Sequence, residues 1–134
     1  MSIIFPFRKD TSPIFGIIHR PVAEVYFKHK KQNLWQSVTM VVDSGADYTL
    51  LPHFLALELG INLNKDCKKI NTQGVGGKSE VYLLKSKTKV RLGEYERNIS
   101  VGFLSSDFIP PLMGRQDFFE TFRVIFENLQ VIFE

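Results

Sequence analysis

The sequence predicts a mostly β fold with one or two short helices, packed as a single domain. Its twelve Phe and many Val and Ile residues favour extended backbone. Gly, Pro and Asn recur at short intervals, which predicts short strands joined by tight turns. With 134 residues, 44% of them hydrophobic, the chain can bury one core. We therefore expect one domain over residues 1–134, with its core in about 15–134.

The first part of the chain predicts three strands. Residues 15–20 and 22–29 have the composition of strands, and polar residues at 30–33 supply a turn. Residues 34–42 alternate well enough to pair with 22–29 in a hairpin. The second strand of this hairpin would end immediately before Asp43.

Residues 52–60 predict the first helix. Pro52 suits the first helical position, and Gly60 is a natural end. Leu55 and Leu59 lie about one helical turn apart, so they share a face. A helix this short must pack against a sheet to be stable.

The rest of the chain predicts further strands around irregular segments. Between residues 85 and 91, Lys and Arg alternate with smaller residues, which predicts a strand with one face in water. The expected elements are strands over 80–93 and 97–104, a loop over 105–112, a second short helix over 115–122, and a hairpin over 123–134 that turns near Glu127 and Asn128.

Asp43 follows the apolar run TMVV (39–42) and precedes Ser44, Gly45 and Ala46. Asp, Ser and Gly are ordinary turn residues, so one interpretation is a strand that ends in a turn. The other interpretation is that the turn presents the carboxylate for chemistry. A tripeptide of this kind decides little by itself, so the choice depends on the wider sequence.

Three segments, in this order, resemble the retropepsins, the retroviral-type aspartic proteases and their cellular and bacterial relatives. They are VVDSGA (41–46), GVGG (74–77) and LMGRQDFF (112–119). The sequence departs from the usual family pattern at Ser44, where Thr is more common. The resemblance implies a closed β-barrel that is active as a two-fold homodimer, with the C-terminal strand in the dimer interface.

The chemistry of aspartic proteases requires two carboxylates close together, which share one proton. One acts as general base on a water molecule, while the protonated partner polarises the scissile carbonyl. Asp43 is the only Asp in this sequence that is followed by Ser or Thr and then Gly. The resemblance therefore implies that an identical subunit supplies a second Asp43 at a two-fold axis.

The resemblance also assigns roles to the neighbours of the catalytic acid. Gly45 would let the backbone approach the carboxylate and donate its N–H to it, with Ala46 next in the active-site loop. The Ser44 hydroxyl would bond across the dimer axis. Asp47 would bind the substrate backbone and pair with Arg115, which braces the loop.

Further site residues are implied above and below the substrate. Residues 73–77 resemble the flap, a hairpin that closes over the bound peptide. Leu112 and Met113 would line the floor of the pocket. The complete set implied to bind substrate is Asp47, Gln73, Gly74, Val75, Gly76, Gly77, Leu112 and Met113, and the structural supports are Gly114 and Arg115.

These assignments predict a hydrolase, an aspartic endopeptidase that cleaves a peptide or protein substrate with water activated by paired Asp43 carboxylates. It would use no metal and no cofactor. The main alternative is a catalytically inactive protein of the same fold that dimerises or binds peptides, because fold does not guarantee activity. A third interpretation is an unrelated β-barrel that binds a small molecule or an RNA. The intact DSGA sequence favours the enzyme, since a scaffold gains nothing from two carboxylates that repel each other.

Two other patterns carry weaker interpretations. GGKS (76–79) imitates the end of a phosphate-binding loop, but Thr72 stands where that motif requires Gly. No metal-ligand spacing is matched by Cys67, His19, His29 and His53.

The composition predicts few partners besides a substrate and a second subunit. The net charge is +3 and the positive residues are scattered, which argues against a nucleic-acid partner. No apolar stretch approaches the roughly 20 residues of a membrane span, and the apolar opening is too short for a signal peptide. The single cysteine permits no internal disulfide. We therefore expect a cytoplasmic protein that does not associate with membranes, in addition to the homodimer that the resemblance implies.

Overall fold

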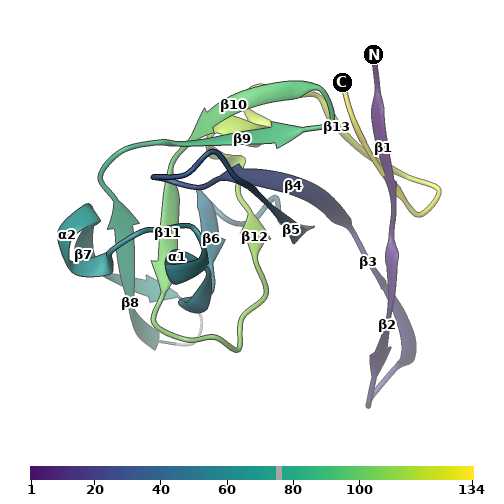
Figure 1. Cartoon of the computed structure of the whole chain (residues 1–134). Helices are drawn as coiled ribbons and strands as arrows, with labels where there is room; N and C mark the ends of the chain where they lie inside the picture. The colour runs from purple at the N-terminus through teal and green to yellow at the C-terminus, as the bar shows by residue number, and fades with distance from the viewer. Residues whose placement is uncertain (75–76) are drawn as a thin grey trace.

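The structure is a computed structural model that describes residues 1–74 and 77–134 (Figure 1). It is mostly β, as the composition predicts, with the short helices α1 (Phe54–Glu58) and α2 (Leu63–Asp66) and an irregular helical turn η1 (Arg115–Phe119). The strands are β1 (Ile3–Pro6), β2 (Arg8–Ser12), β3 (Gly16–Arg20), β4 (Val22–Lys28), β5 (Trp35–Val42), β6 (Thr49–Leu51), β7 (Cys67–Gly74), β8 (Gly77–Leu84), β9 (Thr88–Leu92), β10 (Tyr95–Ile99), β11 (Val101–Leu104), β12 (Leu112–Met113), β13 (Val124–Glu127) and β14 (Gln130–Phe133). None of the described helices is long and apolar enough to cross a membrane.

Nine strands form one large sheet in the order β10-β9-β4-β5-β12-β6-β11-β8-β7. The pairs β5–β12 and β6–β11 are parallel, and the other pairs are antiparallel. Within the described residues the edge strands β7 and β10 do not pair with each other, so the sheet is open and the predicted closed barrel is not formed. The edge strand β7 carries Lys68 and Lys69, and charged side chains on an edge strand disfavour its pairing with another chain.

Strands β4 and β5 form the predicted hairpin at the centre of this sheet. Alternate residues face the core, while residues such as Glu24 and Tyr26 between them are exposed. The buried residues are Ala23, Val25 and Phe27 on β4, and Val38, Met40 and Val42 on β5. Because β5 lies between β4 and β12, its last residue is held from both sides.

Two predicted strands are each divided in the structure. The extended segment expected over 80–93 forms β8 and β9, with a bend between them, and the one expected over 97–104 forms β10 and β11. Ser100 separates the latter two strands, and its N–H donates to the Asp117 carboxylate at 2.9 Å. The bond lies at the point where the chain passes from β10, at the edge of the sheet, to β11 in its interior.

The second helix predicted over 115–122 is present only in part, as an irregular helical turn of five residues. Only η1 (Arg115–Phe119) is helical in this region, and Gln116 and Asp117 inside it have non-helical backbone, with Asp117 at φ 68°. The Asp117 carboxylate bonds to Ser100 N–H and pairs with Lys87 at 3.2 Å. These contacts favour the turn over a regular helix. The predicted first helix is present as α1, and Gly60 ends it with φ 72°.

The two ends of the chain share a small sheet of order β1-β14-β13. β13 and β14 form the predicted closing hairpin, whose turn places Asn128 and Leu129 at φ 50° and 58°. Residues on this sheet, including Val131 and Phe133, are fully buried against the large sheet. β14 pairs with β1 on one edge and β13 on the other, so neither edge is free for another chain.

The hairpin of β2 and β3 is a separate two-stranded sheet. Figure 1 shows it extending well beyond the rest of the chain, on the side where the termini lie. None of the residues in either strand is buried. The sequence predicted the β3 strand but gave no signal for β2, whose residues RKDTS show no apolar alternation.

Candidate active site

Asp43 lies at the end of β5, at the point where the strand leaves the core. Val42 before it is buried, while the Asp43 residue is only partly buried and Ser44 and Gly45 are exposed. The Asp43 N–H donates to the carbonyl of Met113 at 3.0 Å, and the Val42 N–H donates to the carbonyl of Pro21 at 2.9 Å. The strand therefore fixes the backbone of Asp43 and leaves its side chain at the surface.

The residues after Asp43 form a tight turn around its carboxylate. The Gly45 N–H donates to Asp43 Oδ1 at 2.9 Å, as the resemblance implied, and the Ala46 N–H donates to the Asp43 carbonyl at 3.2 Å. A Cβ on Gly45 would lie 3.2 Å from Asp43 Oδ1, a tight contact that favours a residue without a side chain at this position. In the part of the chain that is described, this N–H is the only partner of the carboxylate.

The turn is attached along its length to the segment that follows β12. The Arg115 N–H donates to the Ala46 carbonyl at 2.9 Å, and the Gln116 N–H donates to the Asp47 carbonyl at 2.9 Å. The two segments are about 70 residues apart in sequence, as the separation of Arg115 and Ser44 shows. Their pairing joins the first and third motifs of the sequence into one structure.

Arg115 and Asp47 form the ion pair that the resemblance implied. One guanidinium nitrogen of Arg115 contacts the Asp47 carboxylate, and another donates to the Ser44 carbonyl at 2.7 Å. Both side chains are well exposed, at 47% for Arg115 and 80% for Asp47, so water screens the pair. Its main effect is therefore to hold the turn in place rather than to stabilise the whole fold.

Gly114 allows a close approach that no other residue would permit. A Cβ at this position would lie 2.2 Å from the carbonyl carbon of Tyr48 and 2.3 Å from its oxygen. The Gly114 N–H donates to Thr49 Oγ1 at 3.3 Å, and Thr49 is completely buried. Burial raises the pKa of the Tyr48 phenol, and the negative charge of Asp47 raises it further.

Tyr48 and Thr49 were not predicted as part of the site. One usable signal is Thr49 itself, a polar residue at the start of the short strand β6, directly before Leu50 and Leu51. The approach of Gly114 to Tyr48 is a tertiary contact with no local signature.

The floor of the predicted pocket differs from expectation at one residue. Leu112 is partly exposed, but Met113 is fully buried and cannot touch a substrate in this structure. Met113 pairs with Val42 in the parallel ladder between β12 and β5, which directs its side chain into the core. Its role is to support the floor from beneath.

The predicted flap coincides with the end of the β7–β8 hairpin. Gln73 pairs with Lys78 and Gly74 pairs with Gly77 in the antiparallel ladder. Val75 and Gly76, predicted at the tip, lie outside the described residues. The backbone of the hairpin thus matches the expected element, and its contacts with a substrate remain a prediction.

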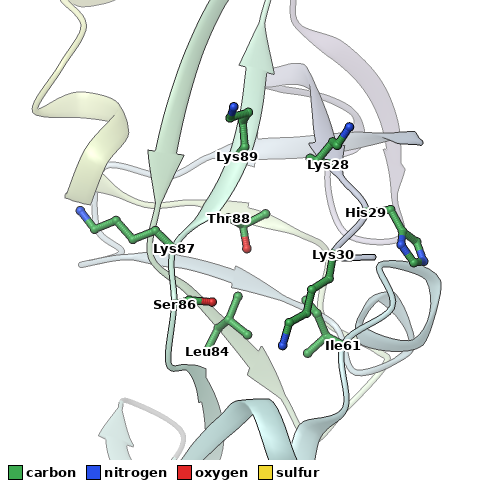
Figure 2. Close-up of a pocket in the computed structure, with 9 residues that line it drawn as sticks. All are labelled: Lys28, His29, Lys30, Ile61, Leu84, Ser86, Lys87, Thr88 and Lys89. Carbon is green, nitrogen blue, oxygen red and sulfur yellow. The ribbon is translucent and has the colours of Figure 1, made fainter. Parts of the chain in front are cut away.

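A lysine-rich pocket lies at the other end of β5 from Asp43, about 25 Å along the strand. It has a volume of about 260 Å³, and Figure 2 shows the side chains of Lys28, Lys87 and Lys89 pointing in different directions. Lys30 pairs with Asp66, and Lys87 pairs with Asp117. The charges are therefore dispersed and partly neutralised, and the pocket shows no focused anion site.

The cysteine and histidines do not form a second site. Cys67 is buried, and burial raises the pKa of its thiol. His29 has a structural use, since its Nδ1 accepts the N–H groups of Lys31 and Gln32 at 3.1 and 3.0 Å in the β4–β5 turn. Among residues 1–74 and 77–134 no group of three His, Cys, Asp or Glu side chains is arranged to hold a metal ion.

Comparisons with known proteins agree with this geometry. Residues 35–120 match the model of a family described as gag-polyprotein putative aspartyl protease. The fold is similar to the crystal structure of a retropepsin-like aspartic protease from Rickettsia conorii, with a TM-score of 0.70, 19% sequence identity and 98% of each chain covered. No curated protein matches the sequence. The matched residues contain both the Asp43 turn and the Arg115 segment that holds it, and the chain belongs to the gag-polyprotein putative aspartyl protease family.

Proposed function

We propose that this chain is an aspartic endopeptidase whose active site forms when two copies bring their Asp43 side chains together. The observation that carries the proposal is the way Asp43 is held. Its backbone is anchored in the core by Met113, while its carboxylate faces outward with the Gly45 N–H as its partner. A carboxylate presented in this way is half of the pair that the chemistry requires.

The reaction follows from two such carboxylates sharing one proton at the dimer axis. The ionised Asp43 takes a proton from a water molecule as the water oxygen attacks the scissile carbonyl carbon. The protonated Asp43 of the other subunit donates its proton to the carbonyl oxygen. The Asp43 that took the proton from water then donates it to the amide nitrogen, the other Asp43 takes a proton from a hydroxyl of the tetrahedral intermediate, and the C–N bond breaks to release a carboxylic acid and an amine. No metal or cofactor takes part in this scheme.

The substrate in this proposal is an extended peptide that lies between the β7–β8 hairpin and the Asp43 turn. Asp47 is exposed and could accept hydrogen bonds from the peptide backbone while its other contact, Arg115, keeps it in place. Leu112 offers an apolar surface beside the catalytic turn. An apolar side chain next to the scissile bond is therefore expected to favour cleavage.

The test uses an unfolded protein mixture as substrate, incubated with the enzyme at acidic and at neutral pH. Asp43→Asn should reduce cleavage by about 10³-fold or more, because an amide can neither act as the base nor share the proton. Sedimentation should show that the variant still forms dimers.

Asp107→Asn is the matched control. Asp107 accepts the N–H of Phe54 at 2.8 Å, and the Asn oxygen can accept the same bond, so activity should stay near the wild-type level. Absence of cleavage by the wild-type protein at every pH, or full activity of Asp43→Asn, would identify an inactive dimerisation or peptide-binding protein instead.

A further inference from the structure

The hairpin of β2 and β3, residues 8–20, which we call the arm, extends from the molecule without support. We infer that the arm docks on a second copy of this chain and helps to assemble the paired active site. The inference rests on the proposed function, because it is the pairing of two Asp43 side chains that determines where the second copy lies.

The arm lacks the packing that a hairpin needs. Its strands pair with each other and with no other described strand, and none of their residues is buried. An isolated two-stranded hairpin is at best marginally stable in water. A surface that covers one face of the arm would therefore supply stability that its own chain does not.

The tip of the arm is apolar and well formed. Ile14, Phe15 and Ile17 are 80%, 78% and 66% exposed. The Ser12 hydroxyl accepts the N–H groups of Ile14 and Phe15, each at 3.2 Å, and Gly16 completes the turn at φ 77°. Exposed apolar side chains on a hydrogen-bonded turn are typical of a surface that contacts another molecule.

The other end of the arm is rigid and lies beside the catalytic turn. Asp10 pairs with Arg8 at 2.9 Å and with Arg20 at 2.8 Å, which ties the two strands together near that end. The next residue, Pro21, accepts the N–H of Val42, and Val42 immediately precedes Asp43. The arm therefore leaves the molecule next to the catalytic acid.

This position determines what the arm meets in the dimer. In an active pair the two Asp43 carboxylates lie about 3 Å apart, so the base of each arm is close to the two-fold axis. Each strand of the arm has five residues and so spans roughly 17 Å. An arm of that length that starts near the axis, and does not fold back on its own subunit, has the partner within its reach.

The terminal sheet strengthens this assignment. The C-terminal strand β14 was expected in the dimer interface, but both of its edges are already paired within its own chain. It cannot extend a sheet into the partner. Other surfaces are therefore needed to hold two subunits together, and the arm offers one, since its base lies next to Asp43 and its tip is exposed and apolar.

The test replaces the apolar residues of the arm together, in the variant Ile14→Ser, Phe15→Ser, Ile17→Ser. Sedimentation should show a dimer dissociation constant at least about a hundredfold above that of the wild-type protein, because three apolar side chains lose their burial. The unfolding transition measured at low concentration, where both proteins are monomers, should be unchanged. Leu57→Ser, on α1, is the matched control, since Leu57 is 85% exposed and lies outside the arm. It should leave dimerisation unchanged.

Hydrogen exchange gives a second measurement that needs no variant. The amides paired between β2 and β3 should exchange quickly in dilute wild-type protein and become protected as the concentration rises through the dissociation constant. Amides of β14 should be protected at all concentrations, because this strand is paired on both edges within one subunit.

The outcomes separate this inference from the proposed function. A wild-type protein that stays monomeric at all concentrations overturns the arm assignment. An arm variant that dimerises as the wild type does also overturns the assignment. If that variant in addition has a raised KM, the arm binds substrate instead. A wild-type dimer that the arm variant disrupts supports the assignment even where no cleavage is found, and in that case the proposed endopeptidase alone fails.

Discussion

The turn at residues 43–47, which we call the catalytic turn after its proposed role, lies next to the base of the arm, yet their own chain supports the two in opposite ways. Asp43 and the residues after it are bonded to Met113, Arg115 and Gln116, so one subunit already fixes their geometry. The arm has no buried residue and pairs only with itself among the described strands. A turn that carries out chemistry has to be preformed, as the Asp43 turn is within one subunit. An element that docks on a partner can instead become ordered when the partner binds.

The largest effect on stability is expected from adding a side chain at Gly114, beside the catalytic turn. Gly114→Ala places a Cβ 2.2 Å from the backbone of Tyr48, and neither backbone can move without breaking the bonds between the two segments. The free energy of unfolding should fall by about 3 kcal/mol in a urea titration.

The arm provides the comparison for this prediction. Gly16→Ala meets no atom within 4 Å, but its φ of 77° costs an Ala residue about 1 kcal/mol. That strain should disorder the tip and leave global unfolding unchanged when both proteins are monomers. Equal losses of stability in the two variants would contradict the contrast between the regions.

A smaller effect is expected from loosening the brace of the catalytic turn. Arg115→Lys keeps the charge but loses the fork that reaches both Ser44 and Asp47. We expect kcat to fall roughly tenfold with a smaller change in KM, because the carboxylate is displaced rather than removed. Stability should change by less than about 1 kcal/mol, since the pair is exposed.

The control for Arg115→Lys is Arg91→Lys. Arg91 also pairs with a carboxylate, Glu96, at 3.1 Å, but it lies on β9 away from the catalytic turn. Its kcat should match the wild type. A lower kcat in Arg91→Lys, or an unchanged kcat in Arg115→Lys, would mean that Arg115 does not position Asp43.

A mixture of wild-type and Asp43→Asn subunits tests whether cleavage requires an intact Asp43 in both subunits of a dimer. When wild-type protein is equilibrated with an equal amount of Asp43→Asn at fixed total concentration, wild-type homodimers make up roughly one quarter of all dimers. Cleavage should fall to that fraction of the wild-type rate. A fall to one half would show that each subunit works alone.

The smallest effect concerns the ionisation of Tyr48, which lies beside the catalytic turn. Its pKa is raised by burial and then by the charge of Asp47, so the fold favours the protonated phenol. The unfolded chain ionises first as the pH rises through about 10, and this ionisation lowers the stability of the wild-type protein. Tyr48→Phe should lose less stability than the wild type between about pH 8 and 11 in urea titrations. Parallel pH profiles would rule out this contribution.

The sequence predicted elements whose signals are local. Alternation in residues 22–29 and 34–42 was enough for the β4–β5 hairpin, and Gly60 marked the end of α1. The helix expected over 115–122 is only partly formed, because the Phe122 N–H donates to the Phe118 carbonyl at 3.0 Å but Gln116 and Asp117 have non-helical backbone. The bond from Ser100 to Asp117, which favours the turn, joins residues 17 positions apart and has no local trace.

The candidate site shows the same division. The Asp43 turn and the pair of Asp47 with Arg115 followed from motifs in the sequence, and the structure forms both contacts. The burial of Met113 and the approach of Gly114 to Tyr48 depend on how β12 enters the sheet beside β5. In the proposed function the second carboxylate comes from a second copy of the chain, and the contacts within one chain do not place it.

The enclosure of β14 between β1 and β13 has a consequence for regulation. A subunit that completes its own terminal sheet can fold without waiting for a second copy. Under the proposed function the active site exists only in the dimer, so the amount of protein would act as the switch. Below the dissociation constant, halving the amount of protein reduces the number of active sites about fourfold. Under that proposal, a low concentration is by itself enough to keep the protein latent.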